Sequence, residues 1–352
     1  MANGAMRQPL TADARLDGFL AAAGWGGAQR RLLAADASFR HYQRVFRDGR
    51  TAVLMVAPPD KEPVAPFLAV QERLVAMGLS APKLIAADRD QGLLLLEDLG
   101  DQTFTRALAA GADETGLYAM AIDVLAALHE RWRPAQGAGL APYDADALMK
   151  EVLLLVDWYL PAASGRPTST AARASFVAAW EAVLAQVSRR RETLVLRDYH
   201  VDNLMLLPGR SGTAACGLLD FQDALLGAAA YDLVSLLEDA RRDIAPDLAE
   251  AMLGRYLAAR PGLKTAIDRD SLLADYAVLG LQRSTKIVGI FTRLDRRDGK
   301  PVYLKHLPRL WRLIERGLEH PSVAPVAVWF EREVPPDLRL QLSSKPRGGV
   351  PC

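Results

Sequence analysis

Residues 196–223 combine side chains whose types and spacing suit chemistry on a phosphate. Asp198 and Asn203 lie in one polar loop of "LRDYHVDNLMLL", and apolar runs flank that loop on both sides. Asp220 follows at the end of a second apolar run, "GLLD". Asparagine and carboxylate oxygens are ligands that Mg²⁺ accepts, and a nearby carboxylate can deprotonate an attacking hydroxyl. The pattern predicts phosphoryl transfer, with Asp198 as the base and Asn203 and Asp220 as metal ligands.

Each of these three residues also fits a purely structural role when it is taken alone. Asp198 and Asn203 are residue types that cap turns, and Asp220 is the kind of polar residue that ends a strand. A metalloenzyme that uses no nucleotide is a further alternative, since two acids and an asparagine can bind a metal. It leaves the β-rich N-terminal part of the chain without a role, so the combination favours phosphoryl transfer.

The elements that must position these residues predict an α+β chain of two lobes. Residues 1–98 read as a small, mostly antiparallel sheet with one main helix at 64–78, and Asp48-Gly49 is a hairpin turn signal. Residues 99–336 read as a larger lobe of long helices, interrupted by short strand pairs at 194–221. We expect a nucleotide-binding lobe, a helical lobe with the catalytic loop and acceptor pocket, and a flexible polar tail at 337–352.

Composition excludes several other classes of protein. The chain has 352 residues, with 43 Lys and Arg against 42 Asp and Glu, so the net charge of +1 gives no nucleic-acid or anionic-membrane footprint. Neither an apolar signal-peptide core nor a membrane-spanning apolar run is found. The two cysteines, Cys216 and Cys352, form no zinc spacing or disulfide framework. We therefore expect a cytoplasmic protein whose partners are small molecules.

The order of motifs resembles the aminoglycoside-phosphotransferase-like branch of the protein-kinase fold. The segments that carry the resemblance are "LRDYHVDN", "LLDFQD" and "AAYDLVSLL", although Leu196 stands where the family has histidine. The resemblance implies a two-lobed kinase-like fold, with Asp232 as a buried acid that supports the catalytic loop through Arg197. The alternative for Asp232 is an acid that complements the dipole at the start of a helix.

Further segments across roughly residues 30–315 resemble bacterial anomeric kinases. They include "DASFRHYQRV", "LLLEDLGDQTF", "YDLVSLLEDA" and "GIFTRLDRRDGKPVYLKHLPRLW". Kinases of this kind phosphorylate the anomeric hydroxyl of N-acetylmuramate and N-acetylglucosamine during peptidoglycan recycling. The resemblance implies ATP and Mg²⁺ as requirements and a sugar 1-phosphate as the product.

Five residues in or next to the first lobe are predicted to bind the nucleotide: Ser38, Arg40, Glu72, Glu97 and Leu99. Ser38 lies in "DASFRHY", where the phosphate-covering loop of a kinase would be, and small residues there let backbone N–H groups approach phosphate oxygens. Glu97 and Leu99 lie in "LLLLEDLG", the expected hinge, and would offer backbone groups to adenine. An ordinary tight turn and a plain linker are the respective alternatives.

The third strand departs from the kinase pattern. Met55 occupies the position of the phosphate-binding lysine, so Glu72, the helix acid that would pair with that lysine, lacks its partner. Arg40, Arg44 and Lys61 are the cations that would replace the missing charge. The departure concerns the nucleotide contacts more than the catalytic loop.

Two helical segments and one acid are predicted to bind the acceptor. Asp157 and Trp158 lie at a helix end in "EVLLLVDWYLP", where the aromatic ring would stack on a sugar. A core role for the ring is the alternative. Asp223, three residues after Asp220, would contact the sugar or support the metal site.

A predicted helix at 270–292 carries a row of cations. Gln282, Lys286, Gly289 and Arg293 share one of its faces, and Arg283 lies beside them. Several cations together suit an anionic acceptor such as the lactyl carboxylate of N-acetylmuramate. A solvated charged face is the alternative.

Two other functions remain open at this stage. The same fold could take another hydroxyl acceptor, such as an aminoglycoside, choline or a homoserine-like alcohol, and the basic helix face argues against the first two. A catalytically silent nucleotide-binding module is motivated by Met55. The intact set of Asp198, Asn203 and Asp220 argues against it.

Overall fold

The computed structural model describes residues 12–33, 39–263, 265–339 and 341–342. The chain forms two compact units, Met1–Thr103 with Met205–Asp223 and Phe104–Leu204 with Ala224–Cys352. No helix among the described residues is both long and apolar enough to span a membrane.

Unit 1 is built on a five-stranded sheet in which every neighbouring pair is antiparallel. The strand order across the sheet is β1-β2-β3-β5-β4. The strands are β1 (Gln29–Leu32), β2 (His41–Arg47), β3 (Arg50–Val56), β4 (Leu84–Asp88) and β5 (Leu93–Glu97). The small antiparallel sheet that the sequence predicts for the first hundred residues is thereby confirmed.

The β2–β3 hairpin turns at the predicted pair Asp48-Gly49. Arg47 pairs with Arg50, so the loop holds two residues, and both have positive φ, 50° at Asp48 and 72° at Gly49. Two-residue hairpins favour such turns because their twist matches that of the strands. The turn therefore sets the register that places Met55 opposite Tyr42.

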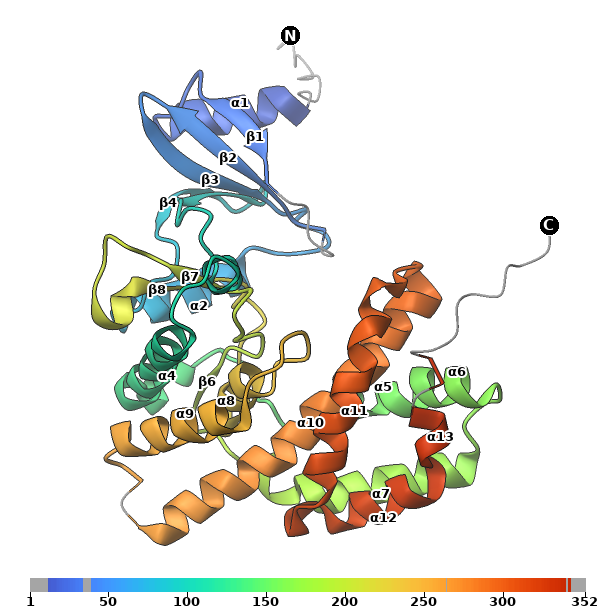
Figure 1. Ribbon diagram of the computed structural model, residues 1–352. Helices are drawn as coiled ribbons and strands as arrows, with labels where there is room; N and C mark the ends of the chain where they lie inside the picture. Colours follow the sequence, from blue (N-terminus) through green and yellow to red (C-terminus); the bar gives the residue numbers. More distant parts are fainter. Residues whose placement is uncertain (1–11, 34–38, 264, 340, 343–352) are drawn as a thin grey trace, which may run out of the picture. The chain divides into compact units, whose positions relative to one another are not determined.

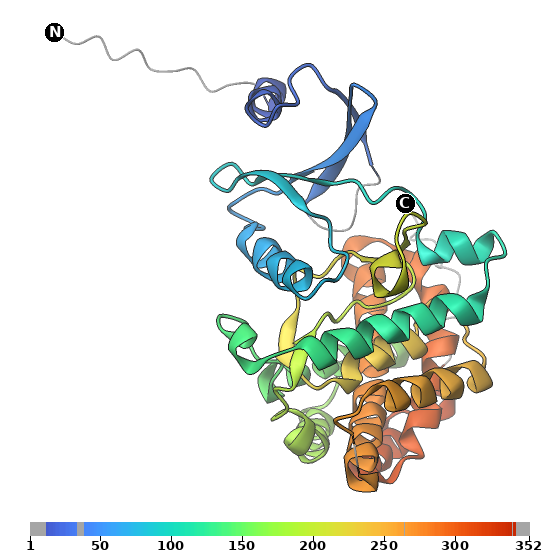
Figure 2. The same cartoon turned by 90° about the vertical axis from the view of Figure 1, so that its left-hand side faces the viewer.

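Two helices lie on opposite sides of this sheet (Figures 1 and 2). They are α1 (Ala12–Ala22) and α2 (Ala65–Ala76). Leu16, Phe19 and Leu20 of α1 pack with alternate strand residues in one buried apolar cluster. Period-two alternation places those strand residues on one face of the sheet. Burial of this face stabilises unit 1.

The second segment of unit 1 adds a small strand pair. β7 (Leu204–Leu206) pairs with β8 (Cys216–Leu218), with the 3₁₀ turn η3 (Gly212–Ala215) between them. Leu218 donates its N–H to Ser80 O at 2.8 Å, and a Cβ on Gly217 would lie 2.9 Å from Leu99 Cδ1. This close packing fixes the strand that leads to Asp220.

Unit 2 is mainly helical, as predicted (Figure 1). Its helices of eight or more residues are α4 (Glu114–Arg131), α5 (Ala145–Leu154), α7 (Thr170–Val187), α8 (Ala230–Leu237), α9 (Pro246–Ala259), α10 (Ala266–Asp298), α11 (Leu307–Leu318) and α12 (Ala324–Glu333). Shorter pieces are α3 (Phe104–Ala109), the 3₁₀ turns η1 (Pro134–Gly137), η4 (Pro301–His306) and η5 (Pro321–Val323), the π-helical turn η2 (Leu155–Tyr159), α6 (Leu160–Ser164) and α13 (Pro336–Arg339). Strand β6 (Thr193–Val195) pairs with β9 (Leu225–Gly227).

The 33-residue helix α10 is the element against which much of unit 2 packs. Its neighbours include α5, η2, α8 and α11. Thr265 and Asp268 form a reciprocal capping box at its start, and Gly299 ends it in the left-handed conformation. Caps of this kind satisfy backbone groups that the helix ends leave unpaired. The middle of α10 is thus held firmly beside α5 and α8.

Candidate active site

The loop that carries Asp198 is held by a buried acid from α8. Asp232, which is only 1% exposed, accepts the backbone N–H groups of Leu196 at 2.7 Å and of Arg197 at 2.9 Å. Ser235 Oγ donates to Arg197 O at 3.1 Å. Arg197 has a φ of 71°, a left-handed conformation that these bonds help to stabilise. Burial raises the pKa of Asp232 to about 7, although the two N–H donors oppose the rise.

The far end of the same loop is tied to its beginning. Asn203 Nδ2 donates to Asp198 O at 2.9 Å, and Asn203 N donates to His200 O at 2.9 Å. Tyr199 donates its hydroxyl to Ala121 O of α4 at 2.8 Å, and Thr105 Oγ1 donates to Asp202. Asp198 and Asn203 therefore come from one rigid loop, which is the preorganisation that a catalytic site needs.

The electrostatic surroundings keep Asp198 in its charged form. Burial raises the pKa of this carboxyl, but Lys286 and Arg283 of α10 outweigh the burial, together with His200 and Arg197, so the pKa lies below its usual value. A carboxylate that is ionised at neutral pH can accept a proton from a hydroxyl. The loop thus presents a half-buried, ionised carboxylate, as the predicted base requires.

Glu151 of α5 joins the catalytic loop to α10. It accepts from Arg197 Nη2 at 2.7 Å, Lys286 Nζ at 2.8 Å and Gln282 Nε2 at 3.0 Å, and also from the Tyr143 hydroxyl. We call these five residues the Glu151 cluster. Burial raises the pKa of Glu151, but the two cations and the hydrogen bonds outweigh it and lower the pKa to about 2. Sequence reasoning missed Glu151. Its signal was a lone carboxylate at the start of the apolar run "EVLLLV".

The predicted cationic face of α10 is buried against α5. Gln282 and Lys286 are both buried and both contact Glu151. A Cβ on Gly289 would lie 2.4 Å from the carbonyl carbon of Leu154, so this glycine permits close helix packing. The solvated-face alternative is wrong for this stretch, and the close approach at Gly289 comes from the chain itself.

Two arginines of α10 differ from Lys286 in their surroundings. Arg283 is 4% exposed, and among the described residues it has neither a hydrogen bond nor an ion pair. Arg293 is half-buried, and its Nε has no hydrogen-bond partner in that same part of the chain. The charges that act on Arg293 are those of Arg297 and Asp298 near the end of the helix.

The other predicted acceptor residues occupy more open positions. Asp157 in η2 is exposed and forms an ion pair with Arg173 of α7. Trp158 beside it is half-buried. Asp223 belongs to unit 1 and is exposed. The structure describes these positions without assigning an acceptor to them.

In unit 1, Asp220 follows β8 by two residues. It has a φ of 56°, its side chain is exposed, and its Oδ1 accepts Gln222 Nε2 at 2.8 Å. The next residue, Phe221, is 1% exposed and packs on Phe67 of α2 with ring centroids 4.9 Å apart. The buried Phe221 ring fixes the neighbouring backbone. The exposed Asp220 carboxylate therefore projects from a well-anchored position.

The segment that follows β5 in unit 1, where the hinge is predicted, binds one of the cations that were expected near the nucleotide. Arg44 of β2 is buried and contacts Asp98 at 2.8 Å, Asp101 at 2.6 Å and Gly100 O at 3.0 Å. Buried cations require this kind of compensation. Arg44 therefore fixes the segment after β5, and its charge is already neutralised there.

The remaining nucleotide-side residues are also placed by the structure. Arg40 forms an ion pair with Glu62 at 2.8 Å, and Lys61 lies over the Phe39 ring at 4.5 Å. Met55 is fully buried in β3, whereas Glu72 on α2 is exposed.

The last residues predicted to bind the nucleotide are the hinge residues Glu97 and Leu99 and the phosphate-loop residue Ser38. Glu97 N donates to Lys83 O at 2.8 Å, and its carboxylate accepts Arg210 Nη2 at 2.5 Å. Leu99 is half-buried. The Ser38 prediction lies outside the described residues. The nucleotide roles of these residues stay predictions.

The oxygen ligands suit a hard cation better than a transition metal. No group of three or more His, Cys, Asp or Glu residues with metal-binding geometry exists in the described part of the chain. The Nδ2 hydrogen bond of Asn203 orients its amide, and the Asp220 carboxylate is exposed. Amide and carboxylate oxygens are ligands that Mg²⁺ accepts. The residues therefore fit the predicted metal.

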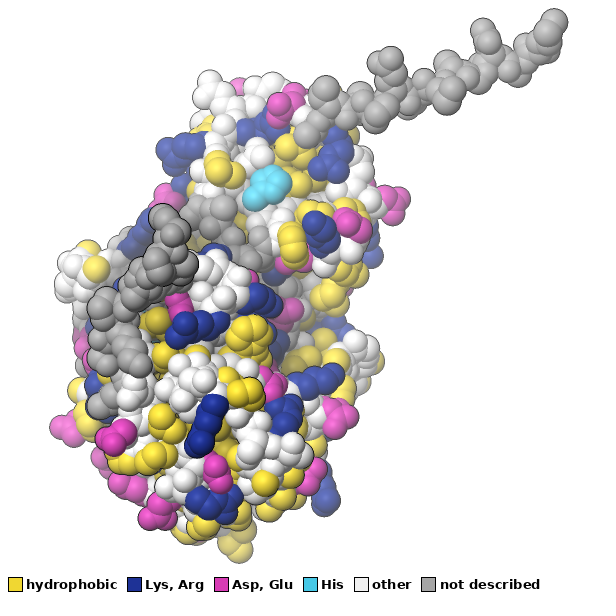
Figure 3. All heavy atoms as spheres, turned by 90° about the vertical axis from the view of Figure 1, so that its right-hand side faces the viewer, with side chains coloured by type: hydrophobic (Ala, Val, Ile, Leu, Met, Phe, Trp, Pro, Cys, Tyr) yellow, Lys and Arg dark blue, Asp and Glu magenta, His cyan; other side chains and the backbone are white. Residues whose placement is uncertain are grey.

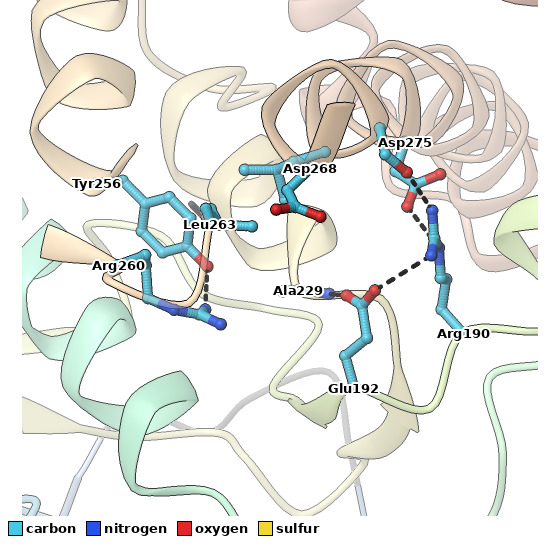
Figure 4. Close-up of a pocket in the computed structure, with 10 residues that line it drawn as sticks. Arg190, Glu192, Ala229, Tyr256, Arg260, Leu263, Asp268 and Asp275 are labelled. Atoms are coloured by element: carbon cyan, nitrogen blue, oxygen red, sulfur yellow. Dashed lines mark hydrogen bonds and ion pairs between the residues drawn. The ribbon is translucent and has the colours of Figure 1, made fainter. Parts of the chain in front are cut away.

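A cavity of about 260 Å³ in unit 2 contains none of the predicted site residues (Figure 4). Its charged groups bind one another, since Arg190 contacts Asp275 at 2.8 Å and Arg260 donates to the Tyr256 hydroxyl at 2.6 Å. Asp268 caps α10. The contacts that these cavity residues make are structural.

On the face drawn in Figure 3, basic and acidic side chains are interspersed outside the grey atoms. This agrees with the balanced composition of the chain.

Residues 29–266 match the family described as "Phosphotransferase enzyme family". A relative from Caulobacter vibrioides, named N-acetylmuramate/N-acetylglucosamine kinase, is 39% identical over 91% of this chain and 96% of its own length. Relatives with the same name come from Neisseria meningitidis serogroup B and Pseudomonas aeruginosa. The first is 36% identical over 83% of this chain and 87% of its own length, and the second 35% over 87% and 89%.

Solved structures confirm the predicted kinase-like fold. A putative aminoglycoside phosphotransferase from Ralstonia eutropha has a TM-score of 0.63 at 16% identity, over 90% of this chain and 98% of its own. An ADP-bound aminoglycoside phosphotransferase has a TM-score of 0.58 at 14% identity, over 88% and 99%. At this identity the likeness concerns the fold alone. The family match and the relatives above 30% identity show that the chain belongs to the phosphotransferase enzyme family.

Proposed function

We propose that this protein is a kinase that transfers the γ-phosphoryl group of ATP to the anomeric hydroxyl of N-acetylmuramate and N-acetylglucosamine. The observation that carries the proposal is the loop at 196–203, in which Asp232 fixes the backbone beside an ionised Asp198. Relatives that share one name over most of the chain support the choice of acceptor. The product would be a sugar 1-phosphate for peptidoglycan recycling, made in the cytoplasm, where ATP is available.

Asp198 is the base in this reaction. It orients the anomeric hydroxyl and takes its proton while the oxygen attacks the γ-phosphorus, and ADP leaves. Transfer is direct, because the motif loop contains no cysteine and because a base next to the nucleophile needs no phospho-enzyme. Arg197 and Asp232 support the loop. The Asp232 carboxylate accepts the Arg197 N–H, and the Arg197 carbonyl accepts the Ser235 hydroxyl.

We propose that Asn203 and Asp220 each supply an oxygen ligand to Mg²⁺. When it is bound, the ion neutralises charge on the ATP phosphates. The Asn203 amide is oriented by its bond to Asp198 O, so the metal ligand and the base depend on one loop conformation. This coupling supports the assignment of both residues.

Nucleotide binding is assigned to the N-terminal lobe at residues 1–98. Glu97 and Leu99 offer backbone groups to adenine, and Ser38 and Arg40 serve the phosphates. The fixed segment after β5, held by Arg44, supports the hinge assignment because a rigid backbone presents its groups in one orientation. Glu72 also belongs to the proposed nucleotide-binding residues.

Acceptor binding is assigned to the helical lobe at residues 99–336. The proposed residues are Asp157, Trp158, Asp223, Arg283, Lys286 and Arg293. Cations on α10 suit an anionic sugar and oppose polycationic aminoglycosides, since like charges brought together repel. The tail at 337–352 has no proposed role.

The substitution Asp198→Asn tests this function. It keeps the shape of the side chain but removes the base, so turnover should fall by roughly 10²- to 10⁴-fold. The measurement is ATP consumption with each sugar, combined with a separate binding titration of ATP and Mg²⁺. Retained nucleotide binding with lost turnover supports the assignment, whereas near-normal turnover shows that Asp198 is not the base.

A catalytically silent nucleotide-binding module is the second candidate. It is favoured by Met55, which is fully buried where a kinase carries its lysine. The same ATP assay decides between the two functions. Product formed by the unmodified protein excludes the silent module, and ATP binding without product from any acceptor favours it.

A further inference from the structure

Arg283 is a buried cation with which no side chain of the described residues forms an ion pair. Its side chain is 4% exposed, yet within the described ranges it makes no hydrogen bond and no ion pair. A buried charge without a partner is costly, and proteins normally pair it. Unlike Arg293 Nε, the guanidinium nitrogens of Arg283 are not among the fully enclosed side-chain atoms of the described residues that lack a hydrogen-bond partner, so they remain accessible to solvent.

The other cation on this part of α10 already has a carboxylate partner. Lys286 donates to Glu151 at 2.8 Å and to the Tyr231 hydroxyl at 3.2 Å. Arg197 also contacts Glu151, at 2.7 Å. Of the three cations that surround the catalytic loop here, Arg283 alone has no carboxylate within ion-pair distance among the described residues.

Arg283 lies close enough to the base to act on its charge. It lowers the pKa of Asp198 and of the buried Asp232, and it also lowers that of His200. Its helix packs against α8, which carries Asp232, and against α5, which carries Glu151. Arg283 therefore belongs to the surroundings of the Asp198 carboxylate without being hydrogen-bonded to it.

We propose that Arg283 binds the carboxylate of the acceptor and so determines how well the enzyme uses N-acetylmuramate compared with N-acetylglucosamine. The inference rests on the proposed function and adds a role for one residue. N-acetylmuramate differs from N-acetylglucosamine by a lactyl ether that ends in a carboxylate. The planar guanidinium of arginine can bind such a group through two parallel hydrogen bonds.

The charge around the base explains why the anionic sugar needs this residue. An acceptor carboxylate that approaches ionised Asp198 meets a like charge, and Lys286 has fewer donors left to bind it because it already donates to Glu151 and to the Tyr231 hydroxyl. Arg283 supplies the missing positive charge from the same unit of the chain as Asp198. The neutral sugar brings no such repulsion, so it should depend on Arg283 much less.

The kinetic test compares Arg283→Gln and Arg283→Lys with the unmodified enzyme on both sugars. Losing a bidentate charged contact should lower kcat/KM for N-acetylmuramate roughly 10- to 100-fold more than for N-acetylglucosamine. The exposed Arg255→Gln, which removes an arginine with no role in the proposed site, serves as the matched control without a selective effect. Equal losses on the two sugars would mean that Arg283 serves the base or the phosphoryl group. Equal losses, no loss, or the same selective loss in Arg255→Gln would each overturn the proposal.

A binding measurement on the unmodified protein keeps the proposal separate from turnover and from variant folding. Calorimetric titration compares N-acetylmuramate with its methyl ester, which removes the negative charge and adds one methyl group. Binding at least tenfold weaker for the ester supports an acceptor carboxylate site, and equal binding overturns it. If neither sugar is phosphorylated, the proposed function fails, while this titration still decides the role of the carboxylate site.

Discussion

The substitution Glu151→Gln removes the charge at the centre of the Glu151 cluster. Glu151 accepts hydrogen bonds from Arg197, Lys286, Gln282 and Tyr143, and its side chain is 14% exposed. A glutamine has nearly the same shape but leaves two neighbouring cations without a counter-charge. Breaking a buried ion pair from one side typically costs about 3–5 kcal/mol. We therefore expect a clear loss of stability.

The lowered pKa of Glu151 gives a second value for the free energy by which this residue stabilises the folded state. Its decrease from 4.5 to about 2 on folding corresponds to on the order of 3 kcal/mol of stabilisation. For a cooperative unit of about 230 residues, the unfolding entropy is roughly 0.5 kcal/mol/K. The variant should therefore unfold ~6 °C below the unmodified protein at neutral pH.

The pH dependence of this difference has a defined sign. Because the folded-state pKa lies below the unfolded value, the stabilisation by Glu151 is fully present above pH 4.5 and is lost as the pH falls toward 2. The gap between the two melting temperatures should therefore narrow over that interval.

Thermal unfolding followed by tryptophan fluorescence measures this gap for the full chain. Asp123→Asn is the matched control, because Asp123 pairs with Arg255 in an exposed ion pair that contributes less than about 1 kcal/mol. A Glu151→Gln protein that melts within 1–2 °C of the unmodified one, as estimated from the same entropy, would refute the account of the cluster.

Two further predictions concern helix packing and the metal. Gly289→Ala places a Cβ 2.4 Å from the Leu154 carbonyl carbon and should destabilise the protein by about 1–3 kcal/mol in a urea titration, whereas Gly254→Ala in α9, which meets nothing within 4 Å, should not. Comparable destabilisation of both variants would contradict the close packing of α10 on α5. Removal of Mg²⁺ with a chelator should abolish transfer, and added Mg²⁺ should restore it. Asp220→Asn should raise the Mg²⁺ concentration needed for half-maximal rate, and an unchanged requirement would exclude Asp220 as a ligand.

The sequence predicted the parts of the fold that depend on local patterns. The hairpin at Asp48-Gly49, the strands of the first lobe and the long helices each follow from residue periodicity and turn chemistry. The order of the acids and the asparagine around the catalytic loop also lies in one short stretch. Local signals sufficed for these features because their determinants are close together in the chain.

Contacts between distant residues could not be predicted in the same way. The charged face of α10 looked suited to solvent or ligand, but Glu151, about 135 residues earlier, binds Lys286. Arg44 likewise meets its acidic partners more than 50 residues later. Which cation is neutralised and which remains unpaired, as Arg283 does, depends on packing that no short motif encodes.

The most direct test of the proposed reaction is phosphorus NMR of the product formed from ATP, Mg²⁺ and N-acetylmuramate. The account predicts a sugar phosphate signal whose phosphorus couples to the anomeric proton, together with one ADP for each phosphate transferred. Asp198→Asn should give neither signal in the same time. A phosphate on another hydroxyl, or inorganic phosphate without a sugar phosphate, would contradict the claim that this enzyme phosphorylates the anomeric position.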